Sequence, residues 1–529
     1  MPTMDAMVFV KGGIQENTQG RLDLFRRVKA CGGTGVILTD IKLGIPAALA
    51  LPSYRARLVS LLDEAASLGL RVVLGTLGVG WSPDALWVNP NLAEAQPVAS
   101  LFEVSETGKA LALAAPGLRL DGSFSNGTAG WSVVDKAGRI GMCAPYLGAQ
   151  AVRVGPGARP AVLSAVLPTR AGAQYHVSWW ARTDGFMGAA AVRVSDTQGQ
   201  LFWFDRNVMP AQPTQAWTRY DYAFIARGPT TLTIGVPGQS SGDVWFDSVE
   251  IEETSLINYV RRAGAPLELR DPATGQRFSE GLDFVITGPF GGDGGTFRPW
   301  HEPPKIKVPA GSALVPRQRV ELTYYATTPV YWNGKTSQNG VCLSDPDALQ
   351  WVDDVAAGLA GLPAWGVLAQ YDELRHGFTC GSCTGAGFTT PGELLAWHIA
   401  RTFGRLRESM PAARPVVWSD MVGGHNARAV GFHVDGSWAG CEAGVPEDAV
   451  ILNWERRSDP EAIAALRSFA KRGLEQWIAG YYDTGDGAAA ARQERGWIEV
   501  AGVEVPAMVF TTWRDDYREM ESYIGEALK

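Results

Sequence analysis

The sequence predicts an α/β fold, a (β/α)8 TIM barrel with an all-β, jelly-roll-like sandwich domain inserted after strand three. Apolar strands and amphipathic helices alternate in the first and last parts of the chain. The alternation stops in the middle of the chain. The first and last parts together supply eight β-α units. A doubly wound sheet is the alternative. Eight β-α units are required by a closed barrel but not by a doubly wound sheet, and no glycine-rich phosphate loop follows the first strand.

The first part of the chain has the β-α-β-α-β pattern that is typical of parallel strands. We expect strands at 6–10, 34–40 and 71–78 and amphipathic helices at 18–32 and 53–70. The first helix runs into a glycine, which commonly ends a helix. These elements predict barrel strands one to three.

The middle of the chain is predicted to be all-β. Short alternating runs separated by Gly, Pro, Asn and Asp are typical of an antiparallel sandwich, and further short strands follow. We expect a first barrel part (1–115), a sandwich (116–254), a small β-rich insert (255–335) and a second barrel part with the catalytic residues (336–529).

The β-α alternation resumes in the last part of the chain. We expect strands four to eight at 365–373, 414–421, 448–455, 474–483 and 505–517. Helices are expected at 345–361, 390–410 and 459–473, and one at the C-terminus. Thr389 or Thr390 should cap the second of these helices, because Pro391 suits the position just inside it.

The composition argues against several classes of protein. Acidic residues outnumber basic ones by 55 to 47, and there is no basic stripe, so no nucleic-acid partner is expected. No apolar run approaches the roughly 20 residues that cross a bilayer, so no membrane partner is expected either. The N-terminus shows no signal peptide. Nineteen tryptophans fit large cores or flat aromatic surfaces.

The predicted ends of the strands carry the polar residues, and chemistry in such barrels takes place at these ends. Strands four to eight each end in an aromatic residue and a carboxylate. The residues are Tyr371, Asp372 and Glu373; Trp418 and Asp420; Trp454 and Glu455; Tyr481, Tyr482 and Asp483; and Trp513 and Asp515. Lys11 and Asp40 end strands one and two, and Arg375 and Asn426 follow strands four and five. Rings stack on sugar faces and carboxylates hold hydroxyl groups, so a carbohydrate pocket is predicted.

These strand ends resemble glycoside hydrolase family 20, the β-N-acetylhexosaminidases. The similarity covers 365–529 and, more loosely, 6–78. The residues that match the family pattern are Asp372 and Glu373, Trp418, Trp454, Tyr481 and Asp483, and Trp513 and Asp515. Gln370 and Tyr371 stand where the family usually has Gly-Gly, and Lys11 stands nearest to its sugar-clamping arginine.

The resemblance implies a retaining, substrate-assisted hydrolase of β-linked N-acetylhexosamine residues. Glu373 would be the acid and then the base, Asp372 would orient the acetamido N–H, and Tyr481 would donate to the acetamido oxygen. The implied substrate-binding residues are Trp418, Trp454, Trp513, Asp483, Asp515, Asp420, Arg375, Asn426, Lys11 and Asp40. The expected partner is an oligosaccharide or polysaccharide, and no cofactor or metal is expected. Such a substrate points to a secreted or periplasmic protein.

Two alternatives remain open. The first is a conventional retaining glycosidase that acts on sugars without an acetamido group, with Asp483 or Glu455 as the nucleophile. The second is a non-catalytic glycan-binding protein. The opening "GSFSNGTAGW" and closing "DVWFDSVEIEE" of the sandwich resemble carbohydrate-binding modules. Exposed rings such as Trp203 would then bind glycan, while Trp179 or Trp180 would belong to the core.

The acid pair imposes a geometric requirement. Neighbours on a regular strand point to opposite faces, so Asp372 and Glu373 serve one pocket only if the strand end bends there. Otherwise Glu373 would form a surface ion pair with Arg375, and Asp372 would cap a loop.

Cys380 and Cys383 form a Cys-x-x-Cys pair shortly after the acid pair. Such a pair can be redox-active or half of a zinc site, and zinc requires two further ligands. The possible partners are Cys342, Cys441, His376 and His425. We expect a loop-stiffening disulfide or inert packing rather than a metal.

Overall fold

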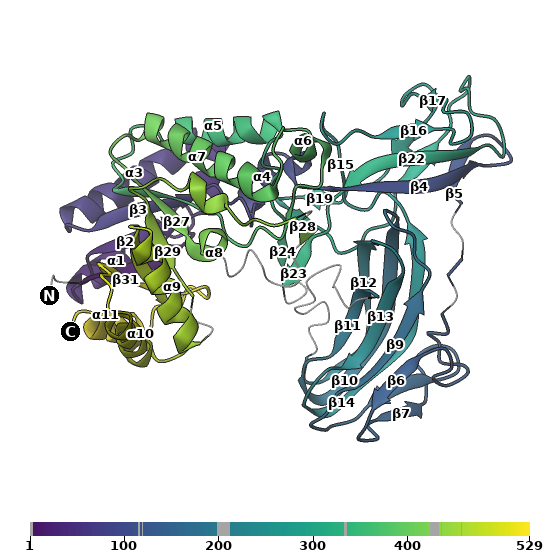
Figure 1. Ribbon diagram of the computed structural model, residues 1–529, viewed down its shortest axis with the longest axis horizontal. Helices are drawn as coiled ribbons and strands as arrows, with labels where there is room; N and C mark the ends of the chain where they lie inside the picture. Colours follow the sequence, from purple (N-terminus) through teal and green to yellow (C-terminus); the bar gives the residue numbers. More distant parts are fainter. Residues whose placement is uncertain are drawn as a thin grey trace.

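The computed structural model describes residues 4–529 except 115–116, 119, 198–211, 333–335, 424–432, 435 and 456–457. Its central element is a closed barrel of eight parallel strands, seen at the left of Figure 1. The strands are β1 (Asp5–Lys11), β2 (Gly35–Thr39), β3 (Arg71–Thr76), β25 (Gly366–Ala369), β27 (Arg414–Trp418), β29 (Val450–Asn453), β30 (Glu475–Tyr481) and β31 (Ala507–Thr511). The predicted barrel of eight strands is confirmed.

Alternate residues of the strands fill the barrel interior. Met7 and Phe9 of β1, Val416 and Trp418 of β27, and Trp477 of β30 belong to this buried cluster. The intervening residues face the surrounding helices and form a separate, larger core with them. Both faces of each strand are therefore buried, which explains the nearly continuous apolar runs in the sequence.

Several of the helices around the barrel begin at a residue whose side chain caps them. The long ones are α1 (Thr18–Ala30), α3 (Pro52–Ser67), α5 (Pro346–Leu359), α7 (Pro391–Ser409), α9 (Asp459–Lys471), α10 (Gly487–Ala501) and α11 (Met520–Ala527). Thr390, one of the two predicted caps, caps α7, since its side chain accepts a hydrogen bond from the Glu393 backbone N–H. Helix α10 was not identified from the sequence, although Asp486 caps its start and Gly502 ends it with a φ of 66°.

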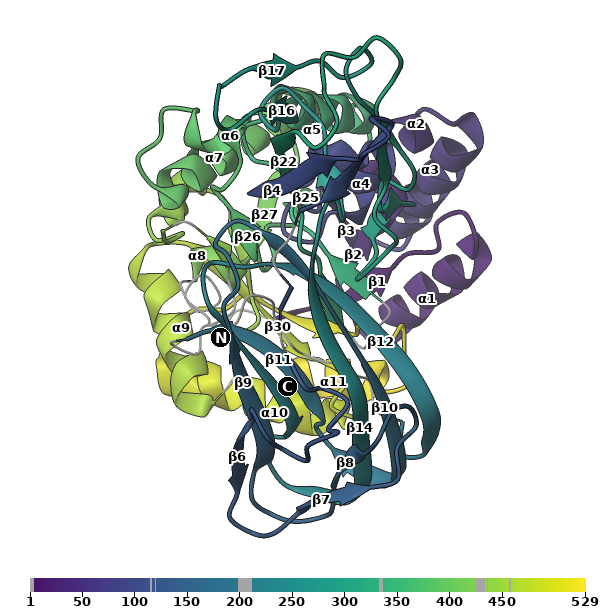
Figure 2. The same cartoon turned by 90° about the vertical axis from the view of Figure 1, so that its right-hand side faces the viewer.

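The sandwich consists of two antiparallel sheets with one shared core. The first sheet has the order β12-β10-β14-β8-β7 and the second β11-β13-β9-β6. The strands are β6 (Ser132–Asp135), β7 (Ile140–Cys143), β8 (Ala151–Val154), β9 (Ala161–Leu167), β10 (Gln174–Gly188), β11 (Ala191–Asp196), β12 (Gln215–Ile225), β13 (Thr230–Val236) and β14 (Ser240–Thr254). Residues of both sheets, including Trp179 and Ile234, pack in one cluster. Figure 2 shows the long strands of this unit in front of the barrel.

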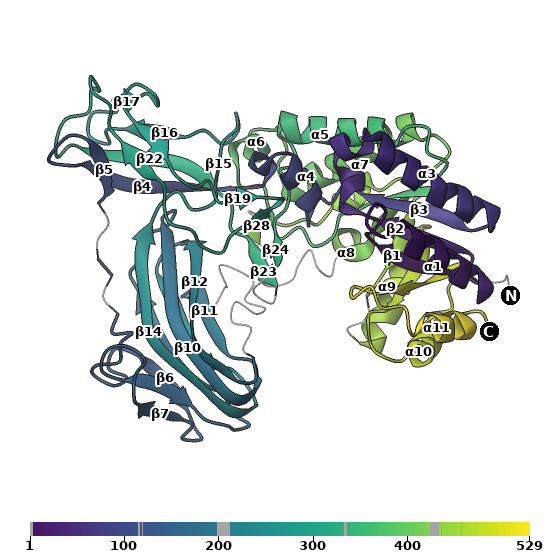
Figure 3. The ribbon, with the colours of Figure 1, turned by 180° about the vertical axis from the view of Figure 1, so that it is seen from behind.

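The small β-rich insert is built from two segments that flank the sandwich. Strands β4 (Gln96–Val104) and β5 (Ala110–Leu113) pair with β22 (Arg319–Ala326) and β21 (Lys305–Lys307), respectively. The same sheet includes β15 (Tyr259–Val260), β16 (Glu268–Arg270), β17 (Arg277–Phe278) and β18 (Val285–Thr287). Figure 3 shows this sheet at the upper left, with the barrel at the right. The expected first barrel part, 1–115, is therefore too long, because the strands at 96–113 belong to this sheet.

No helix in the described part of the chain has both the length and the apolar character that crossing a membrane requires.

Candidate active site

The carboxyl ends of the barrel strands surround a cavity of about 400 Å³. Because the strands are parallel, segments far apart in the sequence meet here. The cavity is lined by Phe9, Lys11, Gly12, Thr39, Asp40, Ile41, Gly78, Trp81, Pro83, Asp84, Gln370, Asp372 and Trp513. Lys11, Asp40, Asp372 and Trp513 were predicted to bind substrate, so the structure brings these four together.

The acid pair lies in a loop and not on a strand. Strand β25 ends at Ala369, several residues earlier than predicted, and Asp372 and Glu373 follow it. Glu373 has a φ of 34°, in the left-handed region that side-chain-bearing residues rarely adopt. The chain thus bends at the acid pair, and Asp372 lines the cavity, whereas Glu373 is not among its lining residues.

A cluster of three carboxyl groups forms around this bend. Burial raises the pKa of Asp372 well above its usual range, and the nearby carboxylates of Asp420 and Glu373 raise it further. The same causes, burial first and then Glu373, raise the pKa of Asp420 to about 7. The Trp454 indole N–H donates to Asp420. Three acids from the ends of strands four and five therefore share one site of restricted solvent access.

We predict that Asp420→Asn weakens the pH dependence of stability. The folded-state pKa of Asp420, about 7, lies above the ordinary 3.8, so the folded protein binds this proton more tightly. This group therefore makes the folded protein less stable as the pH rises from about 4 to about 7. Asparagine cannot ionise and removes the effect. We therefore expect the free energy of unfolding of the variant, relative to wild type, to be higher at pH 8 than at pH 5 by roughly 1–3 kcal/mol.

Thermal and urea unfolding at pH 5 and pH 8 check this prediction. Asp448→Asn is the matched control, because Asp448 forms an exposed ion pair with Arg407. An identical pH slope in Asp420→Asn and wild type would show that Asp420 ionises freely in the folded state.

Arg375 fixes the direction of the Glu373 side chain. Its guanidinium Nη2 lies 2.8 Å from Glu373 Oε2, and Arg375 is 5% exposed. Gln338 accepts from Arg375 Nε at 3.2 Å and donates to the Glu373 carbonyl at 3.0 Å. The Glu373–Arg375 pair anticipated as a surface contact is thus largely buried and built into the site. Gln338 carried no sequence signal, because it ends the short strand β24 (Thr336–Gln338), which does not belong to the barrel.

Aromatic rings form the wall and floor of the barrel mouth. Trp418 packs against Phe9 and Trp513, with ring centroids 5.8 and 6.1 Å away. Trp454 stacks on Tyr482 at 5.7 Å, and Tyr482 meets Trp513 edge-on. The structure therefore brings together the three predicted tryptophans, and it adds Phe9 and Tyr482.

Two buried polar atoms in this region lack hydrogen-bond partners among the described residues. They are Oδ1 of Asp372 and Nε1 of Trp418. An unpaired buried polar atom carries a free-energy cost, and such atoms are commonly satisfied by a ligand or water. The barrel mouth therefore offers one acceptor and one donor to a bound molecule.

Tyr481 does not face the acid pair. Strand alternation would turn it inward with Trp477 and Ala479, but its ring stacks on Phe510 at 4.3 Å in the core between barrel and helices. Tyr481, Tyr482 and Asp483 have φ values of 68°, 47° and 57°. This left-handed run breaks the alternation and is the physical reason for the difference.

Two of the predicted sugar-binding carboxylates accept hydrogen bonds from their own loops. Asp483 accepts from Thr512 Oγ1 at 2.6 Å and from the Trp513 N–H at 2.9 Å. Asp40 accepts from the backbone N–H groups of Ile14 and Lys42. Each accepts a hydrogen bond on both carboxylate oxygens, which leaves fewer acceptor positions for a sugar hydroxyl group.

Asp515 is held by an arginine that the sequence did not reveal. Arg21 of α1, whose side chain is 7% exposed, donates two bonds of 3.0 Å to Asp515 and also bonds the carbonyls of Lys11 and Gly12. Lys11 donates to the Trp513 carbonyl at 3.3 Å. Arg21 thus ties the loops after strands one and eight together. Asn426 lies outside the described residues.

The sandwich has a group of rings on one sheet. Trp203 lies outside the described residues, and Trp179 is fully buried, as expected. Trp180, in contrast, is half-buried and contacts Tyr146, whose ring also stacks on Trp217. Adjacent strand residues point to opposite faces, so Trp179 enters the core and Trp180 does not.

No protein-family model and no curated protein matches the sequence. Among solved structures, a family 20 β-N-acetylhexosaminidase from Streptomyces coelicolor aligns over 38% of this chain and 41% of its own, with 14% identity and a TM-score of 0.24. A rhamnosidase from a Novosphingobium species aligns over 99% of this chain and 59% of its own, with 10% identity and a TM-score of 0.35.

The carbohydrate-binding module TmCBM61, solved with β-1,4-galactotriose, aligns over 26% of this chain and 100% of its own. The identity is 20% and the TM-score 0.22. The chain spans less than two thirds of the length of either enzyme. At these identities and TM-scores the similarities identify no activity for this chain.

Proposed function

We propose that this protein is a glycoside hydrolase that removes β-linked N-acetylhexosamine residues by a retaining, substrate-assisted mechanism. The observation that carries the proposal is the acid pair Asp372–Glu373 at the bend after β25, where Asp372 lines the cavity at the barrel mouth together with Trp81 and Trp513. Because the substrate would be a glycan, we infer that the protein acts outside the cytoplasm.

In this mechanism Glu373 protonates the leaving oxygen and later takes a proton from water. Arg375 and Gln338 hold its carboxylate and backbone in place. The acetamido oxygen of the substrate attacks the anomeric carbon, so no protein nucleophile is needed. The unpaired Oδ1 of Asp372 accepts the acetamido N–H and stabilises the positive charge that develops on the oxazolinium ring.

The donor to the acetamido oxygen is reassigned. Tyr481 was expected in this role, but its ring packs between the barrel and the helices. The buried Trp418 indole N–H, without a partner among the described residues, lies at the barrel mouth and takes this role in our proposal. Trp454, Tyr482 and Trp513 form the walls against which the sugar stacks.

The alternative with a protein nucleophile is less well supported. Asp483, its main candidate, accepts hydrogen bonds on both carboxylate oxygens from Thr512 and Trp513 in the turn after β31. Glu455, at the end of β29, remains for this role.

Hydrolysis assays with matched substrates test the proposal. We expect the wild-type protein to cleave aryl β-N-acetylglucosaminide or β-N-acetylgalactosaminide and to leave the corresponding glucoside and galactoside intact, because the latter lack the internal nucleophile. Equal turnover of the plain glycosides would favour a protein nucleophile, with Glu455 tested next. No turnover of any of the four would contradict the proposal and direct attention to glycan binding by the sandwich.

A further inference from the structure

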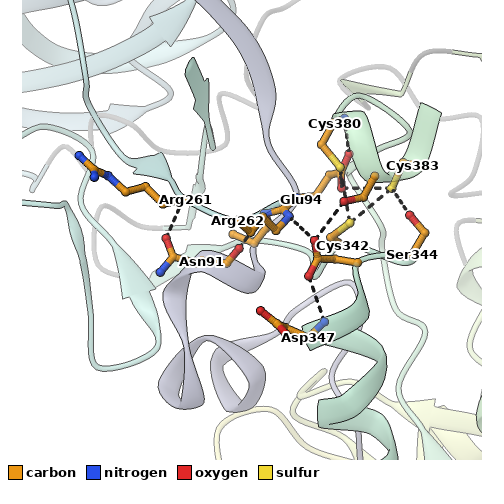
Figure 4. A network of polar contacts seen from close by, with 12 residues as sticks. Asn91, Glu94, Arg261, Arg262, Cys342, Ser344, Asp347, Cys380 and Cys383 are labelled. Atoms are coloured by element: carbon orange, nitrogen blue, oxygen red, sulfur yellow. Dashed lines mark hydrogen bonds and ion pairs between the residues drawn. The ribbon is translucent and has the colours of Figure 1, made fainter. Parts of the chain in front are cut away.

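Four buried side chains of metal-ligand type lie together outside the barrel mouth (Figure 4). They are Glu94, Cys342, Cys380 and Cys383, and their ligand atoms all lie within 4.8 Å of one another. Glu94 is 1% exposed, and each of the cysteines is 0% exposed. The sequence suggested Cys342 as one possible partner of the Cys-x-x-Cys pair, but it gave no indication of Glu94.

The distances within the cluster fit the edges of a tetrahedron. The Sγ atom of Cys342 lies 3.5 Å from the Sγ atoms of both Cys380 and Cys383. Oε2 of Glu94 lies 3.4 Å from Cys380 Sγ and 3.5 Å from Cys383 Sγ. A tetrahedral zinc ion with bonds of about 2.3 Å to sulfur and about 2.0 Å to oxygen would hold its ligand atoms about 3.5–3.8 Å apart.

The geometry does not fit a disulfide. A disulfide bond is about 2.05 Å long, far below the 3.5 Å seen between these sulfur atoms. All six cysteines are among the described residues, and all of them are free. The loop-stiffening disulfide expected from the sequence is therefore not formed. Inert packing gives no reason for the Glu94 carboxylate to direct Oε2 at the sulfur atoms of Cys380 and Cys383, because thiols are only weak hydrogen-bond donors.

The backbone around the cluster holds Glu94 with one oxygen directed at the sulfur atoms. Its Oε1 accepts from the backbone N–H groups of Thr379 and Cys380, at 2.9 and 3.1 Å. Its Oε2 faces Cys380 and Cys383. Buried Arg262 lies beside Glu94 and pairs with Asp345 at 3.1 Å (Figure 4). The ligand oxygen is thus positioned by a second layer of contacts, as is common in metal sites.

We propose that Glu94, Cys342, Cys380 and Cys383 bind one Zn²⁺ ion in a structural site. Thiolates favour soft, tetrahedral ions, and four protein ligands leave no open position for catalysis. The sulfur atoms lie too close together for an iron–sulfur cluster. In such a cluster, cysteines that bind different iron atoms are held further apart than the 3.5 Å seen here. A dication also offsets negative charge that would otherwise be buried together.

The site joins three segments that are distant in the sequence. Glu94 lies two residues before β4, where the chain leaves for the β-rich sheet, and Cys342 lies where the chain returns, before α5. Cys380 and Cys383 lie on α6 (Gly381–Thr384) and its cap, in the loop that also carries the acid pair. The zinc ion would therefore fasten this loop to the base of the insert.

Elemental analysis of the full chain tests the proposal. Purified without chelator, the wild-type protein should contain about one zinc ion per chain, and Cys383→Ser should lower the content about tenfold. Cys441→Ser is the matched control, because Cys441 is equally buried but donates to the Met421 carbonyl outside the cluster. It should retain its zinc.

Cobalt replacement provides a measurement that does not depend on how the variants fold. Wild-type protein loaded with Co²⁺ should show the thiolate charge-transfer and visible bands of a tetrahedral cobalt site. The proposal would be overturned if wild type carried less than about one zinc per ten chains and gave no such spectrum. A disulfide between any two of the three cysteines, found by mass spectrometry without reduction, would also overturn it.

Discussion

Glu373→Gln is expected to lower kcat for an aryl β-N-acetylhexosaminide by about 10²–10⁴-fold, the usual contribution of a general acid–base residue. Glutamine keeps the size of the side chain but can neither give up nor take the proton. The loss should be larger for a sugar leaving group than for a nitrophenyl group, because the poorer leaving group depends more on protonation. Steady-state kinetics on both substrates measure the difference.

Glu442→Gln is the control for this variant, since Glu442 is exposed and does not line the cavity at the barrel mouth. An equal loss for both leaving groups would mean that Glu373 positions the substrate and is not the acid. Retention of full activity would remove Glu373 from the mechanism.

Asp372→Asn should have opposite effects on activity and on stability. The substrate-assisted mechanism loses the charge that stabilises the oxazolinium ring, so we expect kcat to fall about 10²-fold. The folded protein loses a carboxylate whose pKa is raised by burial, Asp420 and Glu373. Its ionised form is therefore disfavoured in the folded protein, and we expect the variant to be more stable than wild type at pH 8.

Unfolding curves and kinetics on the same preparation distinguish this from a structural role. If Asp372 were mainly a loop cap, activity and stability would fall together. Asp483→Asn is the matched comparison, because Asp483 does cap a turn through Thr512 and Trp513. That variant should lose stability.

The sequence predicted the barrel because its signals are local. Short continuous apolar runs identify the buried strands, helical periodicity identifies the helices, and their alternating order identifies parallel strands. The pairing of β4 with β22 was not predictable in this way. The two strands are more than two hundred residues apart, and an alternating pattern shows that a strand exists but does not show its partner.

Part of the candidate site also followed from the sequence. A parallel barrel places all carboxyl strand ends at one face, so Asp372, Glu373 and the three tryptophans could be expected to meet there. The direction of each side chain could not be predicted. Tyr481 is turned outward by the left-handed backbone at the end of β30, and Asp40 and Asp483 are used by their own loops.

The barrel, the β-rich middle and an acid pair close to the end of the fourth barrel strand could be predicted from the amino-acid sequence. Folding was needed to show which acids share a buried site, how Arg375 and Gln338 hold Glu373, and that Glu94 and Cys342 lie beside the Cys-x-x-Cys pair. The physical reason is that periodicity and strand ends are local properties of the chain. Desolvation, charge coupling and ligand geometry depend on residues that only folding brings together.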